Sequence, residues 1–360
     1  MSKPHIWLRA ETKPFERRTP LTPQGAKQLI DDGYKVTVED SEQSIFSGEC
    51  YQQVGCDIAS PGSWQNADPT AYILALKELP EDEFNLIHRH IYFAHAYKEQ
   101  QGWQQLLGRF KNGQGQLFDL EYLVDDNQRR IAAFGYWAGF AGAALGVIAW
   151  ANQQLNITPS LAHVQAYDDK QPLFDDIQAK LEQLKSARIP LPKVMVIGAL
   201  GRSGTGACDL AAQFNLEVIK WDMAETAPGG PFEQINQADV MVNCVFVQQD
   251  LPPFTTKQMV AKADRKLSMI VDVSCDPYSS FNPLPIYHQC TTFDKPCLTL
   301  DVPNKPLELI AIDHLPSLLP KESSEDYSGQ LLKQLRLIQS EQADVWHRAL
   351  ALFGDKTALL

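Results

Sequence analysis

A glycine-rich turn between an apolar strand and a helix constrains the fold of this chain most. The apolar run from Val194 to Ile197 predicts a buried strand, and glycines follow at positions 198, 201 and 204. A helical run then ends near Phe214, and the next predicted strand, Leu216 to Trp221, is followed by Asp222. Strands that alternate with helices predict a parallel α/β sheet.

The same turn predicts a dinucleotide site. The spacing Gly198-x-x-Gly201-x-x-Gly204 departs from G-x-G-x-x-G, and a glycine triplet alone is also compatible with a tight structural turn. The context favours a nucleotide, because the turn lets backbone N–H groups approach a pyrophosphate at a helix N-terminus. A carboxylate such as Asp222 binds ribose hydroxyls and repels a 2′-phosphate. We therefore predict NAD rather than NADP, with Arg202 neutralising the pyrophosphate.

The N-terminal part predicts a second α/β unit. Residues 5–10 and 35–39 predict strands, and Thr22 and Pro23 are typical of a helix start between them. Two more apolar runs, 71–76 and 91–94, predict buried strands of the same sheet. Ligands of open α/β sheets bind beyond the carboxyl ends of the strands. We therefore expect Arg18, Lys77 and His95, which follow three of these strands, to lie close together.

These elements predict an α/β fold with two Rossmann-like domains, parallel sheets and an interdomain cleft. We expect residues 1–133 plus 321–360 to form a substrate-binding domain and residues 134–320 to form an NAD-binding Rossmann domain. A helical tail over 327–353 is predicted to pack on the first domain. Residues 134–151 carry no charge, but their many Gly and Ala residues favour a buried helix over a membrane span.

Composition limits the partners. The formal net charge of -12 argues against binding to nucleic acid or to an anionic membrane surface. The seven cysteines show no metal-binding spacing, so we expect no metal and reduced thiols. The N-terminus lacks the pattern of a signal peptide, and we expect a cytoplasmic protein that acts as a monomer on small molecules.

Cations gather near predicted loops and strand ends of this acidic chain, which indicates a local site for an anionic ligand. A solvated surface is the alternative interpretation for most of them, and a buried core role is the alternative for His95. Lys77 directly ends an apolar strand, where burial lowers the pKa of an amine. Glu16, Glu78 and Glu121 are expected to balance the cations, which are Lys13, Arg17, Arg18, Lys77, Lys98, Arg129 and Arg130.

Blocks of residues along nearly the whole chain resemble the NAD-dependent, lysine-forming saccharopine dehydrogenases. The N-terminal block, from Leu8 to Pro23, reads LRAETKPFERRTPLTP. Further blocks are Leu76-Lys-Glu, Phe93-Ala-His95-Ala-Tyr-Lys98, Arg129-Arg-Ile-Ala-Ala-Phe134, Lys220-Trp-Asp222, Val271-Asp-Val-Ser-Cys-Asp276 and Ile312-Asp-His-Leu-Pro316. The wider superfamily, which includes alanine dehydrogenase, shares the two-domain plan but matches fewer blocks.

The resemblance implies NAD-dependent oxidation of saccharopine to lysine and 2-oxoglutarate, a step of lysine biosynthesis. It implies that Lys77 and His95 are the catalytic acid/base pair. It also implies a substrate site lined by Lys13, Arg18, Lys98, Arg130, Phe134, Ser274, Cys275 and Asp276. The implied NAD site comprises Arg129, Gly198, Gly201, Arg202, Gly204, Asp222, Thr226, Phe246, Val273, Ile312, Asp313, His314 and Leu315.

The sequence departs from the fungal pattern of this family at two positions. Ser203 replaces a cysteine, so a disulfide to Cys244 that the fungal branch forms is not expected here. Phe246 replaces a tyrosine, which removes a hydroxyl from the implied cofactor site. Two other functions stay open at this point: an alanine dehydrogenase-like amino-acid dehydrogenase, and a non-catalytic NAD-binding sensor.

Overall fold

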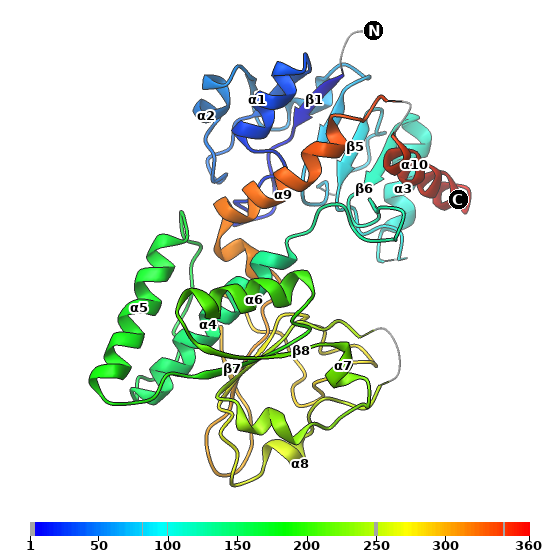
Figure 1. Cartoon of the computed structure of the whole chain (residues 1–360). Helices are drawn as coiled ribbons and strands as arrows, with labels where there is room; N and C mark the ends of the chain where they lie inside the picture. Colours follow the sequence, from blue (N-terminus) through cyan, green and yellow to red (C-terminus); the bar gives the residue numbers. More distant parts are fainter. Residues whose placement is uncertain (1–3, 81, 99, 248–250, 341–342) are drawn as a thin grey trace. The chain divides into compact units, whose positions relative to one another are not determined.

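The computed structural model describes residues 4–80, 82–98, 100–247, 251–340 and 343–360. The chain divides into two compact units, residues 1–133 with 320–360 (unit 1) and residues 134–319 (unit 2). Each unit holds a six-stranded sheet with helices, and Figure 1 shows the elements of both. The predicted α/β class is confirmed, while the cleft between the units stays a prediction.

Unit 1 is built on a parallel sheet with the strand order β3-β2-β1-β4-β5-β6. Every pair of neighbours is parallel, so all six strands end at one edge of the sheet. The central strands are buried on both faces, as expected for a parallel sheet covered by helices. The strands are β1 (His5–Leu8), β2 (Lys35–Glu39), β3 (Asp57–Ala59), β4 (Tyr72–Leu74), β5 (Arg89–Tyr92) and β6 (Gln116–Asp119).

The helices of unit 1 come from both ends of the chain. The predicted N-cap is confirmed, because the Thr22 side chain accepts a hydrogen bond from the Gly25 N–H. The tail, predicted over 327–353, consists of two helices: α9 contacts α1, and α10 contacts β6 and α3. The helices are α1 (Pro23–Asp31), α2 (Gly48–Gln53), α3 (Trp103–Gly113), α9 (Pro320–Leu335) and α10 (Asp344–Thr357), with a 3-10 turn at Ser63–Asn66.

Unit 2 holds a sheet with the order β11-β12-β10-β9-β7-β8. Five strands are parallel, and the short edge strand β11 runs antiparallel to β12, which the sequence did not predict. The strand order reverses at β7, which has β8 on one side and β9 on the other, and this is the position where such sheets bind nucleotides. The strands are β7 (Lys193–Ile197), β8 (Glu217–Trp221), β9 (Val240–Asn243), β10 (Met269–Asp272), β11 (Leu298–Thr299) and β12 (Glu308–Ile310).

The uncharged segment 134–151 forms most of the buried helix α4 (Gly135–Gln154). Its small residues allow close packing against α6, where a Cβ on Gly139 would lie 1.7 Å from the carbonyl oxygen of Ser203. No helix in the described part of the chain is long and apolar enough to cross a membrane. The other helices of unit 2 are α5 (Gln171–Ser186), α6 (Arg202–Gln213), α7 (Met223–Thr226) and α8 (Lys257–Val260), with 3-10 turns at Glu233–Gln237 and Leu315–Leu318.

Candidate functional site

Lys77 and His95 follow neighbouring parallel strands of unit 1. Leu74 of β4 pairs with Ile91 of β5, and the chains stay side by side beyond the strands, since the Phe93 N–H donates to the Leu76 carbonyl. The residue after Lys77 is Glu78, and its Oε1 lies 3.6 Å from Nε2 of His95, within ion-pair distance when the imidazole is protonated. His95 lies in the left-handed region (φ 51°), a strained conformation that is common at functional sites. The fold therefore brings both predicted residues to the carboxyl ends of two neighbouring strands, at one edge of the sheet.

The Lys77 amine lies beside a tightly bound carboxylate. Glu16 accepts two hydrogen bonds from the Arg18 guanidinium, at 2.8 and 2.6 Å, and its Oε2 is 3.9 Å from Lys77 Nζ. Burial raises the pKa of the Glu16 carboxyl group, but the hydrogen bonds and the charge of Arg18 lower it, as does the charge of Lys77. The net effect is a lowered pKa for Glu16. Burial is the largest cause that lowers the pKa of the Lys77 amine, and repulsion from the Arg18 charge lowers it further. The negative charge of Glu16 opposes this shift but does not reverse it. A lowered pKa suits an amine that accepts a proton near neutral pH.

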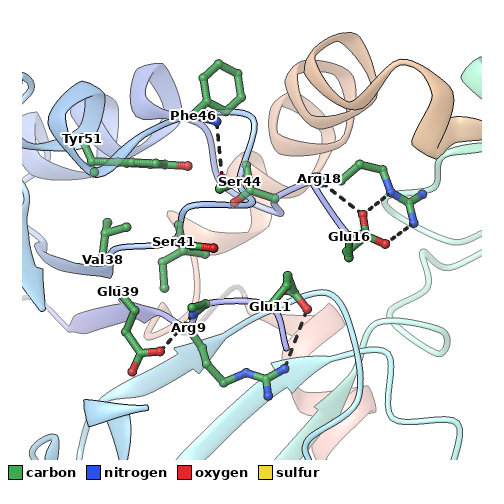
Figure 2. A pocket seen from close by; sticks show the side chains of 14 residues that line it. Arg9, Glu11, Glu16, Arg18, Val38, Glu39, Ser41, Ser44, Phe46 and Tyr51 are labelled. Carbon is green, nitrogen blue, oxygen red and sulfur yellow. Dashed lines mark hydrogen bonds and ion pairs between the residues drawn. The ribbon is translucent and has the colours of Figure 1, made fainter. Parts of the chain in front are cut away.

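A buried ion pair that the sequence did not single out fixes the backbone at Lys77. The Glu11 carboxylate accepts the N–H groups of Leu76 and Lys77 at 2.6 and 3.0 Å. Arg9 lies 4.0 Å from Glu11 and donates to the Lys77 carbonyl oxygen at 2.5 Å. Figure 2 shows this pair beside the Glu16–Arg18 pair, around a small cavity of about 20 Å³. A cavity of this size holds about one water.

The carboxyl end of β6 organises two further cations. Glu121 pairs with Arg130 at 3.1 Å and with Lys98 at 3.6 Å, and Glu16 pairs with Arg18, so the expected balancing of cations is confirmed for Glu121 and Glu16. Glu78 instead lies beside His95. The backbone N–H of Glu121 donates to the carboxyl group of Asp119, the last residue of β6. Burial raises the pKa of Asp119 to about 7. Sequence reasoning missed Asp119, although a carboxylate at the end of an apolar strand is the signal that drew attention to Asp222.

Three other predicted residues of the substrate and NAD sites differ in exposure and position. Lys13 is exposed, and its carbonyl oxygen accepts hydrogen bonds from Glu16 and Gln43. Arg129 is exposed, and its backbone N–H donates to Asp125. Phe134 belongs to unit 2, where it is the half-buried N-cap residue of α4.

The glycine turn of unit 2 has the geometry of a phosphate cradle. Gly198 has φ 84°, and a Cβ on Gly204 would lie 2.0 Å from the Gly198 carbonyl oxygen, so neither position accommodates a side chain without a shift. Gly201 is the N-cap residue of α6, and among the described residues no side chain caps the first N–H groups of this helix. The first N–H groups of this 12-residue helix are therefore suited to an anion. The fit to a pyrophosphate is good.

Asp222 lies beside the turn, as the sequence predicts for a ribose-binding carboxylate. One carboxylate oxygen accepts the Leu200 N–H at 2.8 Å, and the other accepts the Met223 N–H at 2.9 Å. Thr226 donates its hydroxyl to the Asp222 carbonyl oxygen. Asp222 therefore joins the turn to α7, and its carboxylate is half-buried rather than enclosed.

Asp272 at the end of β10 holds the next loop of unit 2. Its Oδ1 accepts from the Asn243 side chain at 2.9 Å and from the Ser274 hydroxyl at 2.6 Å, and its Oδ2 accepts from Tyr287 at 2.6 Å. This network joins the ends of β9 and β10 and orients the Ser274–Asp276 segment. Sequence reasoning missed these partners of Ser274, although one polar residue in the run Met-Ile-Val-Asp-Val was a visible signal.

The other residues of the implied NAD site differ in exposure. Phe246 is 58% exposed, while Arg202, Asp313 and His314 are also exposed. Ile312 and Leu315 are each 1% exposed, so their side chains belong to the core. Only their backbone groups are available to contact a cofactor. Val273 packs against the same core cluster. Cys244 is a free thiol, as expected with Ser203 in place of a cysteine.

Comparison with known proteins agrees with the fold. The alanine dehydrogenase/PNT N-terminal and C-terminal domain families match residues 7–141 and 231–354. Among solved structures, an L-alanine dehydrogenase superposes with a TM-score of 0.66 at 15% identity, covering 96% of this chain and 93% of its own. A transhydrogenase from Sinorhizobium meliloti gives 0.59 at 15% identity, covering 93% and 94%.

Sequence relatives decide the family. Saccharopine dehydrogenase [NAD(+), L-lysine-forming] of Yarrowia lipolytica is 48% identical over 98% of this chain and 97% of its own. The Schizosaccharomyces pombe protein of the same name is 45% identical over 98% of both chains. The chain belongs to the saccharopine dehydrogenase (NAD+, L-lysine-forming) family. The expected membership of this saccharopine dehydrogenase family is thereby confirmed.

Proposed function

We propose that the chain catalyses the reversible, NAD+-dependent oxidation of L-saccharopine to L-lysine and 2-oxoglutarate. Membership of the family carries the proposal, since the relatives named for this reaction align with the chain over nearly their whole length. The arrangement of Lys77 and His95 supports it, because each lies at the end of a neighbouring strand beside a carboxylate. NAD+ supplies the hydride acceptor when it is bound.

Proton transfers are the task that we assign to Lys77 and His95. Saccharopine joins lysine through its ε-nitrogen to a glutarate skeleton, and this nitrogen must lose a proton before its lone pair can assist the departure of hydride. Water then adds to the resulting carbon–nitrogen double bond, and a further proton transfer releases lysine. Lys77, with its lowered pKa, is suited to take up a proton, and His95 to exchange the others.

Arg18, Lys98 and Arg130 are proposed to bind the substrate carboxylates. Saccharopine has three carboxylates, and a guanidinium can bind a carboxylate through two parallel hydrogen bonds. Glu16 and Glu121 hold these cations in place before substrate binds. Lys13, Phe134, Ser274, Cys275 and Asp276 are proposed to complete the substrate site.

The NAD site is assigned to the glycine turn of unit 2. The uncapped N-terminus of α6 would hold the pyrophosphate, with Arg202 at its first turn. Asp222 would accept hydrogen bonds from the adenosine ribose. The domains of the proposal are 1–133 plus 321–360 for substrate and 134–320 for NAD.

A cytoplasmic, monomeric enzyme is part of the proposal. All seven cysteines are free, which suits a reducing compartment. Light scattering during size exclusion tests the monomer, since the mass of one chain is expected and that of two would contradict it.

An assay of NADH consumption tests the function. NADH should disappear when lysine and 2-oxoglutarate are supplied together, and not when pyruvate and ammonia replace them. Consumption with pyruvate and ammonia would favour an alanine dehydrogenase-like enzyme. NAD binding without turnover on either substrate pair would favour a non-catalytic sensor.

A further inference from the structure

Two cysteines of unit 2 lie in contact next to the segment assigned to substrate. The Sγ atoms of Cys275 and Cys290 are 3.5 Å apart, and the Cys275 thiol also lies 3.1 Å from the Ala311 carbonyl oxygen. A disulfide has an S–S distance near 2.05 Å, so the two sulfurs need to approach by about 1.5 Å. We propose that Cys275 and Cys290 form a peroxide-sensitive dithiol, which oxidises to a disulfide that reversibly inactivates the enzyme.

The two thiols differ in accessibility. Cys290 is half-buried, while Cys275 is 9% exposed. Burial, together with the neighbouring Cys290, Asp272 and Asp313, raises the pKa of the Cys275 thiol. Because thiolates react with peroxides and buried thiols do not ionise readily, Cys290 is the sulfur that oxidises first.

The reaction balances with a hydroperoxide as the oxidant. The Cys290 sulfur attacks one oxygen of hydrogen peroxide, the O–O bond breaks, and water leaves with the thiol proton to give a sulfenic acid. The Cys275 sulfur then attacks the Cys290 sulfur, the S–O bond breaks, and the departing hydroxide takes the Cys275 thiol proton and leaves as a second water. The two thiols lose two electrons in total, and one peroxide is reduced to two waters.

The disulfide would distort two loops of the proposed site. Cys275 follows Ser274, which Asp272 positions, and has φ 49°, a strained conformation for a residue other than glycine. Cys290 precedes Thr291. The Thr291 N–H donates to the Ala311 carbonyl oxygen, and the Thr291 hydroxyl oxygen accepts from the Ala311 N–H. Oxidation removes the thiol hydrogen that Cys275 offers to Ala311, and draws the two loops together. A displacement of about 1 Å in an active site can lower turnover about 100-fold.

The experiment uses the full chain with the exposed thiol removed (Cys50→Ser), so that intermolecular reactions at Cys50 do not interfere. Hydrogen peroxide treatment should join the peptides containing Cys275 and Cys290 in non-reducing mass spectrometry. It should lower saccharopine turnover about 100-fold, and dithiothreitol should restore it. Adding Cys290→Ser should abolish both the joined peptides and the reversible loss.

Three outcomes would overturn the proposal: the absence of the joined peptides, joined peptides in an enzyme of unchanged turnover, or a loss of turnover that persists in the Cys290→Ser variant. The effect on turnover rests on the proposed function, whereas the disulfide does not. A chain without saccharopine turnover in its reduced form would contradict the proposed function, and mass spectrometry would still decide whether the dithiol oxidises. A loss of turnover that persists in the Cys290→Ser variant would assign the damage to another residue.

Discussion

Replacing Asp119 by asparagine should change how the stability of the protein depends on pH. The Asp119 carboxyl group is 1% exposed, and burial raises its pKa from 3.8 to about 7. The folded state therefore holds this proton more tightly than the unfolded state does. The contribution of the protonated carboxyl is complete below the unfolded pKa and is lost as the pH rises through the folded pKa.

The shift in pKa sets the size of the effect. A difference of about three pH units corresponds to about 4 kcal/mol, at 1.36 kcal/mol for each unit. The asparagine side chain of the Asp119→Asn variant does not ionise, and its amide oxygen can still accept the Glu121 N–H that Asp119 accepts at 2.9 Å. The variant should gain free energy of unfolding relative to the wild type as the pH rises from about 4 to about 7, and the gain should then level off.

Urea unfolding of the full chain, followed by tryptophan fluorescence at a series of pH values, measures this difference. Asp355→Asn, at an exposed carboxyl in α10 of the same unit, is the matched control and should show no such gain. A difference between Asp119→Asn and the wild type that stays constant from about pH 4 to about pH 7 would refute the reasoning, because Asp119 would then titrate alike in both states.

Three further substitutions test other parts of the account. Asp222→Ala should raise the KM for NAD+ and relax the rejection of NADP+, and an unchanged cofactor preference in steady-state kinetics would remove Asp222 from the ribose site. Glu11→Gln breaks a buried pair with Arg9 and should lower the free energy of unfolding by about 3–5 kcal/mol in urea titrations; a loss below about 1 kcal/mol would contradict its structural role. Arg130→Gln should raise the KM for saccharopine at least about tenfold and leave the KM for NAD+ nearly unchanged, because a charge-assisted contact with a substrate carboxylate is removed. An equal rise for both substrates would argue against a carboxylate contact.

Local signals explain which parts of the fold the sequence predicts well. The helix that begins at Pro23 is marked by its own N-cap, Thr22, and the strand before Gly198 by a continuous apolar run. Both features depend on neighbours along the chain. The antiparallel β11 is two residues long, so its pairing with β12 depends on tertiary contacts that no local pattern reveals.

The candidate site shows the same limit. Strand ends indicate that Lys77 and His95 lie at one edge of the sheet, because parallel strands share their direction. The Arg9–Glu11 pair is not visible in this way, since its effect on Lys77 runs through backbone groups 66 residues away along the chain. Asp272 likewise acts through Asn243 and Tyr287, which come from other elements.

The break between α9 and α10 was missed because the sequence over 327–353 is helical in composition throughout. The structure ends α9 at Leu335, and the indole N–H of Trp346 in α10 donates to the Gln334 carbonyl oxygen. A side chain from the second helix therefore binds the C-terminal turn of the first. Composition carries no information about such a contact.

Turnover of saccharopine by Lys77→Met and His95→Gln, measured as NADH formation with saturating NAD+, tests the central claim most directly. Each variant should lose about two to four orders of magnitude in kcat, the usual contribution of a positioned acid or base. The exposed residues Lys111 and His347 offer matched controls, and Lys111→Met and His347→Gln should keep the turnover of the wild type. Near-normal turnover in a correctly folded Lys77→Met or His95→Gln enzyme would contradict the assignment of that residue to the chemistry.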